Sequence, residues 1–236
     1  NGTVDALFGI VMATGTTTTA TDSSVRLAAG GESDIRLSQI VATNVSLLAE
    51  RDIVDNLAAE TANVTATVLR MVADSNSNAA GQIGSGADEI DTSVTTLAAR
   101  SADGIYVRES SGLTVDSTGD ITVQRANFDS TLTAVTDTSL SDLQTTDAGA
   151  VKVVVDAGSL TVNEGDADDT GVVAGTSGDV LLEATAGDVV LNADVESTTG
   201  HITVTAGDDV DQNADITTGT PGTVLVTAAN GTADAL

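Results

Sequence analysis

The stretch TAGDVVLNADV, Thr185–Val195, is followed after a short interval by TAGDDVDQNADI, Thr205–Ile216. The offset between the two passages is one position larger at their shared Asn-Ala-Asp than at their shared Thr-Ala-Gly, so a single insertion separates these points. Repetition at a nearly constant interval is the signature of repeat architectures, in which each repeat is one supersecondary unit. The chain is therefore expected to form short coils that stack on one another.

A shorter motif predicts the secondary structure of each coil. It consists of Gly, a residue that is usually polar, an apolar residue, any residue, and a second apolar residue. Because Gly adopts positive φ and alternating β-branched residues send every second side chain to one face, the motif predicts a turn followed by a strand. Its six copies are GDITV at Gly119, GSLTV at Gly158, GDVLL at Gly178, GDVVL at Gly187, GHITV at Gly200 and GTVLV at Gly222.

Similar strands recur along the whole chain and set the length of a coil. A second strand follows in most coils, as at Ile35, Ile105, Leu160 and Val189, and a weaker third follows at Leu113, Val172, Val195 and Ile216. The predicted fold is all-β, a parallel β-helix (β-solenoid) of about nine coils with about 25 residues each. The nine leading strands begin at Val25, Val45, Leu69, Thr95, Ile121, Val151, Val180, Ile202 and Val224.

One stretch leaves a second secondary structure open. Ser46–Leu69 contains helix-favouring residues with i, i+4 spacing in places. Strands are predicted on both sides of it, and its segment Asn63–Val68 is rich in β-branched residues, which favours strand. A short local helix is the alternative for this stretch.

The composition favours a narrow interior. Only Phe8, Tyr106 and Phe128 are aromatic, there is no Trp, and the 41% of apolar residues are mostly Ala, Val, Leu and Ile. A compact globule of this size usually needs larger side chains, because protein interiors are densely packed. Small aliphatic side chains lining stacked coils account for the missing aromatic residues.

The two ends of the sequence resemble each other. NGTVDAL at positions 1–7 and NGTADAL at positions 230–236 match at six of seven positions with an offset of 229. We expect residues 1–236 to be a single β-solenoid repeat unit, with a 229-residue period plus a seven-residue overlap, cut from a longer tandem array. The expected partners are adjacent copies, end to end, with lateral assembly into fibres as a further option.

The charge excludes two classes of partner. The chain carries 35 acidic and 8 basic residues other than His, a formal net charge of −27. Nucleic acids and anionic lipids bind through basic side chains, so neither is an expected partner. The longest apolar run, Leu7–Ala13, is too short to span a bilayer, which predicts no membrane insertion. Abundant Asp with one Lys fits either a saline environment or a generic acidic surface.

The GDITV-type motif, together with coils that are rich in Thr, Ala and Asp and lack Cys, resembles the repeat regions of filamentous-haemagglutinin-like proteins and other very large bacterial surface exoproteins. The resemblance covers most of the chain and consists of a coil pattern. It implies secretion, a long β-helical shaft, and a role in adhesion, biofilm or surface layers. No catalytic or binding residue carries over from it. The long period of the unit departs from the short irregular coils of that family and favours a regular fibre or sheath.

The strongest candidate metal site is EGDADDTG, Glu164–Gly171. Asp166, Asp168 and Thr170, followed by Gly171, imitate the first half of a calcium loop, in which oxygen ligands alternate and Gly permits a sharp turn. Position twelve of such a loop is Ser177 rather than Glu, so an acidic solvated turn is the competing interpretation. Gly207–Asp215 is a second acidic cluster. Calcium is the only cofactor that the sequence suggests.

Catalysis has little support in the sequence. His201, the only histidine, occupies the polar position of GHITV, which predicts an exposed turn residue rather than a catalytic base. Paired carboxylates can cleave polysaccharides, but such sites need sugar-stacking aromatic residues and a cleft. We therefore expect no enzyme. Sequons at Asn1, Asn44, Asn63 and Asn230 permit glycosylation without indicating it.

The function expected from these observations is a structural repeat of an extracellular fibre, sheath or stalk, built from a giant repetitive secreted protein. The alternative is the β-helical shaft of a cell-surface adhesin whose binding domain lies outside this segment. A polysaccharide-active β-helix is the third candidate. All three place the protein outside the cell or on its surface.

Overall fold

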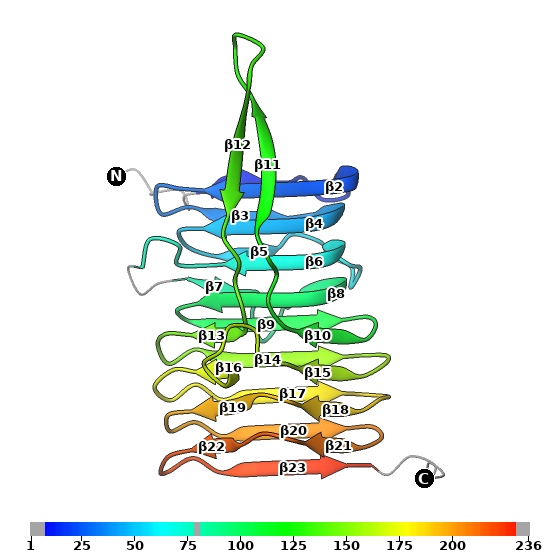
Figure 1. Cartoon of the computed structure of the whole chain (residues 1–236), viewed down its shortest axis with the longest axis vertical. Helices are drawn as coiled ribbons and strands as arrows, with labels where there is room; N and C mark the ends of the chain where they lie inside the picture. The colour runs from blue at the N-terminus through cyan, green and yellow to red at the C-terminus, as the bar shows by residue number, and fades with distance from the viewer. Residues whose placement is uncertain (1–7, 78–80, 230–236) are drawn as a thin grey trace.

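The computed structural model describes residues 8–77 and 81–229, which form strands β1 to β23 and no helix. One sheet of 21 strands contains all the parallel pairs and winds into an upright stack (Figure 1). The predicted all-β parallel β-helix is therefore confirmed. The helix alternative is wrong, because Ser46–Leu69 contains the end of β4, all of β5 and the start of β6.

One series of strands runs the full length of the stack, and its register gives the length of each coil. Ile35 pairs with Ile53, Ile53 with Ile83, and Val180 with Ile202, so the offset between paired residues varies from coil to coil. The coils are therefore unequal in length. The series is β1 (Phe8–Val11), β3 (Asp34–Leu37), β5 (Ile53–Asp55), β7 (Gln82–Ile83), β9 (Gly104–Glu109), β14 (Ala150–Val155), β17 (Val180–Ala184), β20 (Ile202–Ala206) and β23 (Val224–Ala228).

The rest of each coil differs between the two halves of the molecule. Near the N-terminus it is one long strand, and near the C-terminus it is two short strands separated by a corner. β8 joins the two arrangements, because its Thr96 and Leu97 pair with β10 while its Ala99 pairs with β13. The long strands are β2 (Thr17–Ala29), β4 (Gln39–Ala49), β6 (Val64–Val72) and β8 (Ile90–Ser101). The short strands are β10 (Leu113–Val115), β15 (Leu160–Val162), β18 (Val189–Leu191) and β21 (Val210–Gln212), and, after the corner, β13 (Leu143–Thr145), β16 (Thr170–Ala174), β19 (Asp194–Ser197) and β22 (Ile216–Thr218).

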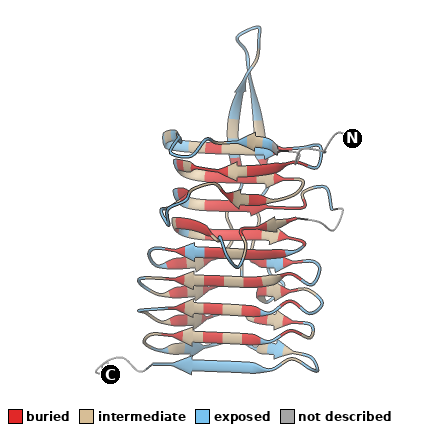
Figure 2. Ribbon diagram, turned by 180° about the vertical axis from the view of Figure 1, so that it is seen from behind, coloured by how far each residue is buried: buried red, intermediate tan, exposed pale blue. Residues whose placement is uncertain are grey.

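The interior is a set of aliphatic columns parallel to the stack. Buried and half-buried residues alternate along β14, β17 and β20, as expected for strands with one inward face (Figure 2). Val153, Leu182 and Val204 are each fully buried and lie directly over one another. The narrow core of Ala, Val, Leu and Ile that the composition predicted is present.

Only two of the six motif glycines have the positive φ that the sequence suggested. Gly119 and Gly158 have positive φ, but Gly178, Gly187, Gly200 and Gly222 do not. A Cβ on Gly200 would overlap the carbonyl oxygen of Gly178, which is the motif glycine of the preceding coil. Glycine is therefore needed at this corner because consecutive backbones approach too closely for a side chain.

Glu109 compensates for an irregularity in the ladder. This fully buried residue occupies an inward position, in register with Val155 on the next coil. Its carboxylate accepts hydrogen bonds from Val94 N and Thr92 Oγ1, both at 2.8 Å, where β8 changes its partner from β9 to β10. Two further bonds come from the backbone and hydroxyl of Ser111. Glu109 thus supplies acceptors that a regular strand would have supplied.

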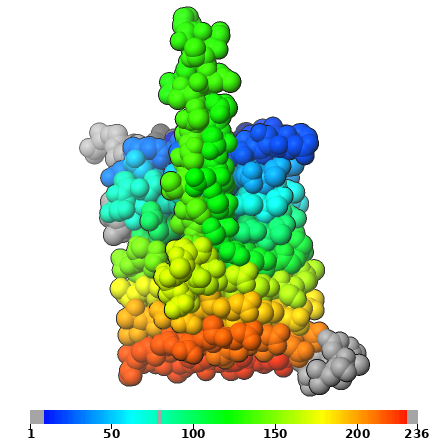
Figure 3. Space-filling model, in the orientation of Figure 1, coloured from blue at the N-terminus to red at the C-terminus, as the bar shows by residue number. Residues whose placement is uncertain are grey.

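A β-hairpin interrupts the coil between β10 and β13. It consists of β11 (Ile121–Ala126) and β12 (Leu132–Asp137), which pair antiparallel with each other only. The hairpin runs along the outside of the N-terminal coils and its tip projects beyond β2 (Figures 1 and 3). The expectation that the strand at Ile121 forms one of the nine coils is therefore wrong.

Polar contacts hold the base of the hairpin against the coils. Asp137 accepts hydrogen bonds from Arg26 Nε at 2.8 Å and from Ser46 Oγ at 2.7 Å, and the latter bond is buried. These bonds and the nearby Arg26 and Arg70 charges keep the pKa of Asp137 below its ordinary value despite its burial. Arg70 Nε donates to the carbonyl of Thr138 at 3.0 Å. The base is thereby attached to β2, β4 and β6.

The predicted strands divide between two series. Those at Val25, Val45, Leu69 and Thr95 belong to the long strands, whereas those from Val151 onward belong to the full-length series. The full-length series contains nine strands, but they are not the nine strands that the sequence predicted. The two TAG segments, residues 185–187 and 205–207, do not occupy equivalent positions in their coils. Ala206 in the second TAG pairs with Ala184, which precedes the first TAG. The register then shifts by one position before Val189 pairs with Val210.

Candidate functional site

The candidate metal loop lies at a corner of the stack, close to a residue that the sequence did not indicate. Asp166 and Asp168 belong to the loop between β15 and β16, and Asp142 immediately precedes β13. β13 pairs with β16 through Leu143 and Val172, so the two segments lie on consecutive coils. Figure 3 shows the loop, in yellow-green, beneath the base of the hairpin.

Three carboxylates converge there. One carboxylate oxygen from each of Asp142, Asp166 and Asp168 lies within 4.8 Å of the other two. Asp166 and Asp168 are exposed, but Asp142 is only 7% exposed and its Oδ1 has no hydrogen-bond partner. Burial, reinforced by the charges of Asp166 and Asp168, raises the pKa of Asp142 to about 7. The three residues, called the Asp142 cluster below, combine buried and accessible oxygen ligands.

The loop's own hydrogen bonds orient its side chains. Asp168 Oδ1 accepts from the backbone N of Thr170 at 2.9 Å and from its hydroxyl at 2.8 Å, which lowers the pKa of Asp168. Glu164 Oε1 accepts from the backbone N of Asp166 at 2.8 Å and also from that of Ala167. Of the three predicted ligands, Asp166 and Asp168 meet, while the Thr170 hydroxyl donates to Asp168. Asp142 could have been found only from the register of β13 on β16.

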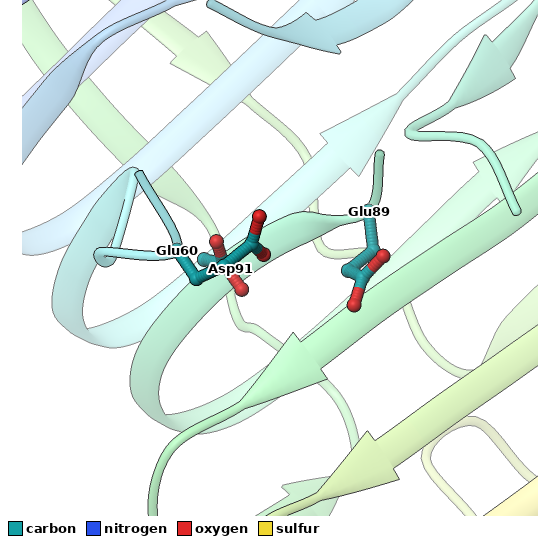
Figure 4. Close-up of side chains that lie close together, drawn as sticks. All are labelled: Glu60, Glu89 and Asp91. Atoms are coloured by element: carbon teal, nitrogen blue, oxygen red, sulfur yellow. The ribbon is translucent and has the colours of Figure 1, made fainter. Parts of the chain in front are cut away.

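A second cluster lies beside a hollow of about 480 Å³. Glu60 lies in the loop before β6, Glu89 directly precedes β8, and Asp91 is the second residue of that strand; their carboxylates are close together (Figure 4). Asp91 is 7% exposed and its Oδ2 has no hydrogen-bond partner. Burial, followed by the charges of Glu60, Asp55 and Glu89, raises the pKa of Asp91 to about 6.

A basic side chain distinguishes this hollow from the Asp142 cluster. Arg108 lies in it, with Nη2 at 2.8 Å from Asp156 Oδ1 and Nη1 at 3.5 Å from Glu89 Oε1. These carboxylates raise the pKa of Arg108. The hollow thus already holds a positive charge opposite Glu89, and that charge lowers the pKa of Asp91 in opposition to the stronger acidic effects.

The acidic cluster predicted in Gly207–Asp215 is divided by the structure. Asp208 and Asp209 meet Asp188 of the preceding coil within 4.8 Å, and none of the three is buried. Asp215 lies at the next corner, where its backbone N donates to Asp194 Oδ1 at 2.9 Å. This cluster resembles an ordinary solvated acidic turn.

The structure also shows the surroundings of the histidine and of two of the asparagines that the sequence analysis singled out. His201 is exposed, as predicted for a turn position, and its Nδ1 lies 2.8 Å from Thr223 Oγ1. Asn63 is fully buried, with its amide bonded to Asp55 Oδ1 at 2.5 Å, so it is inaccessible to glycosylation in the folded chain. Asn44 is half-buried on β4. Asn1 and Asn230 lie outside the described residues.

Within residues 8–77 and 81–229, no helix with the length and apolarity needed to cross a bilayer is present. In the comparisons with known proteins, no family model, curated protein or solved structure matches the chain.

The pKa of Asp91 generates a prediction about stability. Because this pKa is raised from 3.8 to about 6, the folded chain binds a proton at Asp91 more tightly than the unfolded chain does. Unfolding free energy should therefore fall as pH rises from about 4 to about 6. The Asp91→Asn variant has no such proton, so its stability in chelator should fall less over this range than that of the wild type. Urea unfolding across pH measures the difference.

Taking the difference between the two proteins removes contributions from Asp142 and other groups common to both. The charged groups that act on Asp91 are Glu60, Asp55, Glu89 and Arg108. Parallel stability profiles for wild type and Asp91→Asn would show that Asp91 has an ordinary pKa and contradict the environment described.

Proposed function

We propose that this chain is a structural unit of an extracellular fibre, sheath or stalk, in which copies stack end to end. The observation that carries the proposal is the open last coil. Val224 and Val226 continue the core columns of Ile202 and Val204, yet they are 44% and 41% exposed (Figure 2). In the described part of the chain, β23 pairs on one side only, with β20.

At the opposite end of the described chain, the first strands also pair on one side only. β1 pairs with β3 and β2 pairs with β4, and Val11 on β1 is 55% exposed. An edge strand offers a row of unpaired backbone groups to any strand of matching shape. A further copy at either end would continue the parallel ladder at about 4.8 Å per coil and cover the exposed valines. The tandem arrangement expected from the repeated heptapeptide, whose copies lie outside the described residues, belongs to the same proposal.

The hairpin would give such a stack a direction and would hold neighbouring copies together. Because its tip projects beyond β2, it would overlap the C-terminal coils of the neighbouring copy (Figure 1). Arg125 shares the inward face of the hairpin with the buried Ile121, by strand alternation, and forms no ion pair within the described chain. The hairpin rises from the corner that, farther down the stack, carries Asp194 and Asp215. Arg125 therefore has the charge that this acidic corner of a neighbour lacks.

A ladder of amide side chains makes that corner regular enough to receive the hairpin. Asn163 Nδ2 donates to Asp116 Oδ2, Asn192 Nδ2 to Asn163 Oδ1, and Asn213 Nδ2 to Asn192 Oδ1, each at 3.0 Å. Beside this ladder, a shallow hollow of about 460 Å³ is lined by acidic and amide side chains. The same chemical surface is thus repeated on consecutive coils.

The proposed mechanism is mechanical. Continuous backbone hydrogen bonding along the stack resists bending and stretching, and the net charge of −27 keeps the sides hydrated and separate. No reaction is part of this proposal.

The shaft of an adhesin is the second candidate, because the same stack would hold a distal binding domain away from the cell. A distinct non-repetitive domain in the parent gene would favour the adhesin, and uninterrupted copies of this unit would favour the fibre. A polysaccharide-active β-helix is the least favoured, and turnover of acidic or neutral polysaccharides would be needed to support it.

Replacing Val226 tests end-to-end stacking. Val226→Lys places a charge in the core column of the last coil, where the adjoining copy would bury it, so self-association should weaken at least about tenfold. Leu225→Lys is the matched control, since Leu225 pairs with the outward Thr203 and points away from the column. Sedimentation equilibrium of both variants and the wild type measures the association. Equal weakening by both variants, or no association of the wild type, would contradict the proposal.

Disulfide trapping tests the position of the hairpin. The chain has no Cys, so every cross-link reports on an engineered pair. Phe128→Cys at the exposed hairpin tip, mixed with Ala214→Cys, should give a cross-linked heterodimer on mild oxidation. Phe128→Cys mixed with Lys152→Cys, on the full-length strand series, should give much less. Similar yields from the two mixtures would show that the hairpin tip does not lie over the corner that carries Asp194 and Asp215, and would contradict the proposed position.

A further inference from the structure

We propose that Asp142, Asp166 and Asp168 bind one divalent cation of the calcium class. This inference does not rest on end-to-end stacking, because all three ligands belong to one chain. It extends beyond the acidic loop by including Asp142, which comes from the preceding coil.

The first argument is the buried carboxylate. Asp142 is 7% exposed and its Oδ1 makes no hydrogen bond, although buried polar atoms in folded proteins are nearly always paired. An unpaired buried oxygen of a charged group is costly. A cation shared with Asp166 and Asp168 would supply the missing interaction, and these two residues converge on Asp142 from the loop.

The second argument is uncompensated charge. Asp166, Asp168 and Glu164 all act on Asp142 with the same sign. Arg100 lines the same hollow, of about 240 Å³, but forms no ion pair with any of the three aspartates. At the second cluster, formed by Glu60, Glu89 and Asp91, Arg108 already pairs with Glu89. The Asp142 cluster therefore contains a buried carboxylate and, unlike the second cluster, has no ion-paired basic side chain among the described residues to offset its charge.

The third argument is geometry. Calcium binds six to eight oxygens at about 2.3–2.6 Å, so two oxygens on one ion are at most about 5 Å apart. The three carboxylate oxygens lie within 4.8 Å of one another and satisfy this limit without rearrangement. Asp166 and Asp168 are exposed, which leaves the outer side of the ion open to water. An all-oxygen set with free positions suits calcium better than metals that prefer sulfur or nitrogen.

Binding would have a structural consequence. Asp142 lies between the end of β12 and the start of β13, and Asp166 and Asp168 lie on the next coil. A shared ion would join the base of the hairpin to the corner below it. It would also offset the repulsion that the three carboxylates exert on one another in the cation-free chain.

Thermal unfolding of the whole chain, in EDTA and in millimolar CaCl₂, tests the proposal. At about a hundredfold excess of calcium over Kd, the melting temperature should rise by about 5–10 °C. Asp142→Asn should abolish this rise, and in EDTA it should melt above the wild type because one repelling charge is gone. Asn tolerates the positive φ of 66° found at Asp142, so the variant should fold.

Two matched variants locate the site. Asp188→Asn, in the exposed cluster, and Asp91→Asn, beside Arg108, should both retain the full calcium response. Calorimetric titration of the wild type with CaCl₂ should give one site that is absent from Asp142→Asn. The proposal is overturned if calcium leaves the wild-type melting temperature unchanged, or if Asp142→Asn keeps the response. Neither result depends on whether the chain self-associates.

Discussion

The structure depends on hydrogen bonding between strands that lie one coil apart in the chain. In the C-terminal coils the offset is constant along the full-length series, and it places Val180, Ile202 and Val224 over one another. Because strand side chains alternate with a period of two, a slip of one residue would turn the whole aliphatic column outward. The register therefore determines the core, the corners and the positions of the acidic clusters together.

The departures from this register carry the distinctive features of the molecule. Where β8 leaves β9 for β10, the carboxylate of Glu109 replaces a missing strand acceptor. Where the coil is interrupted after β10, the inserted chain forms the hairpin, attached through Asp137 to Arg26 and Ser46. The Asp142 cluster lies just beyond the same interruption. A regular solenoid has none of these features. The proposed contact of the hairpin with a neighbouring copy and the proposed cation site therefore both arise from one insertion into an otherwise repetitive fold.

The sequence was sufficient to predict the fold class, because strand periodicity and glycine spacing are local properties. It could not predict which strands pair, since the strands at Thr95 and Val151 look alike but belong to different series. Nor did it distinguish the hairpin strand at Ile121 from a coil strand, because GDITV carries the same local pattern as GHITV. Asp142 was missed for the same reason, since its approach to Asp166 depends on the pairing of β13 with β16. The reason for glycine at Gly200 is likewise a contact between coils.

Disulfide formation between coils measures the register most directly. Leu181 and Thr203 are paired on β17 and β20, and both lie on the half-buried outward face. Adjacent paired Cα atoms fall within disulfide range, so the double variant Leu181→Cys/Thr203→Cys should cross-link readily within one chain. Leu181→Cys/Thr205→Cys, in which the second position is displaced to the next outward residue, should cross-link poorly. Preferential cross-linking of the displaced pair would contradict the register in which β17 pairs with β20, and with it the pairing of coils that forms the core.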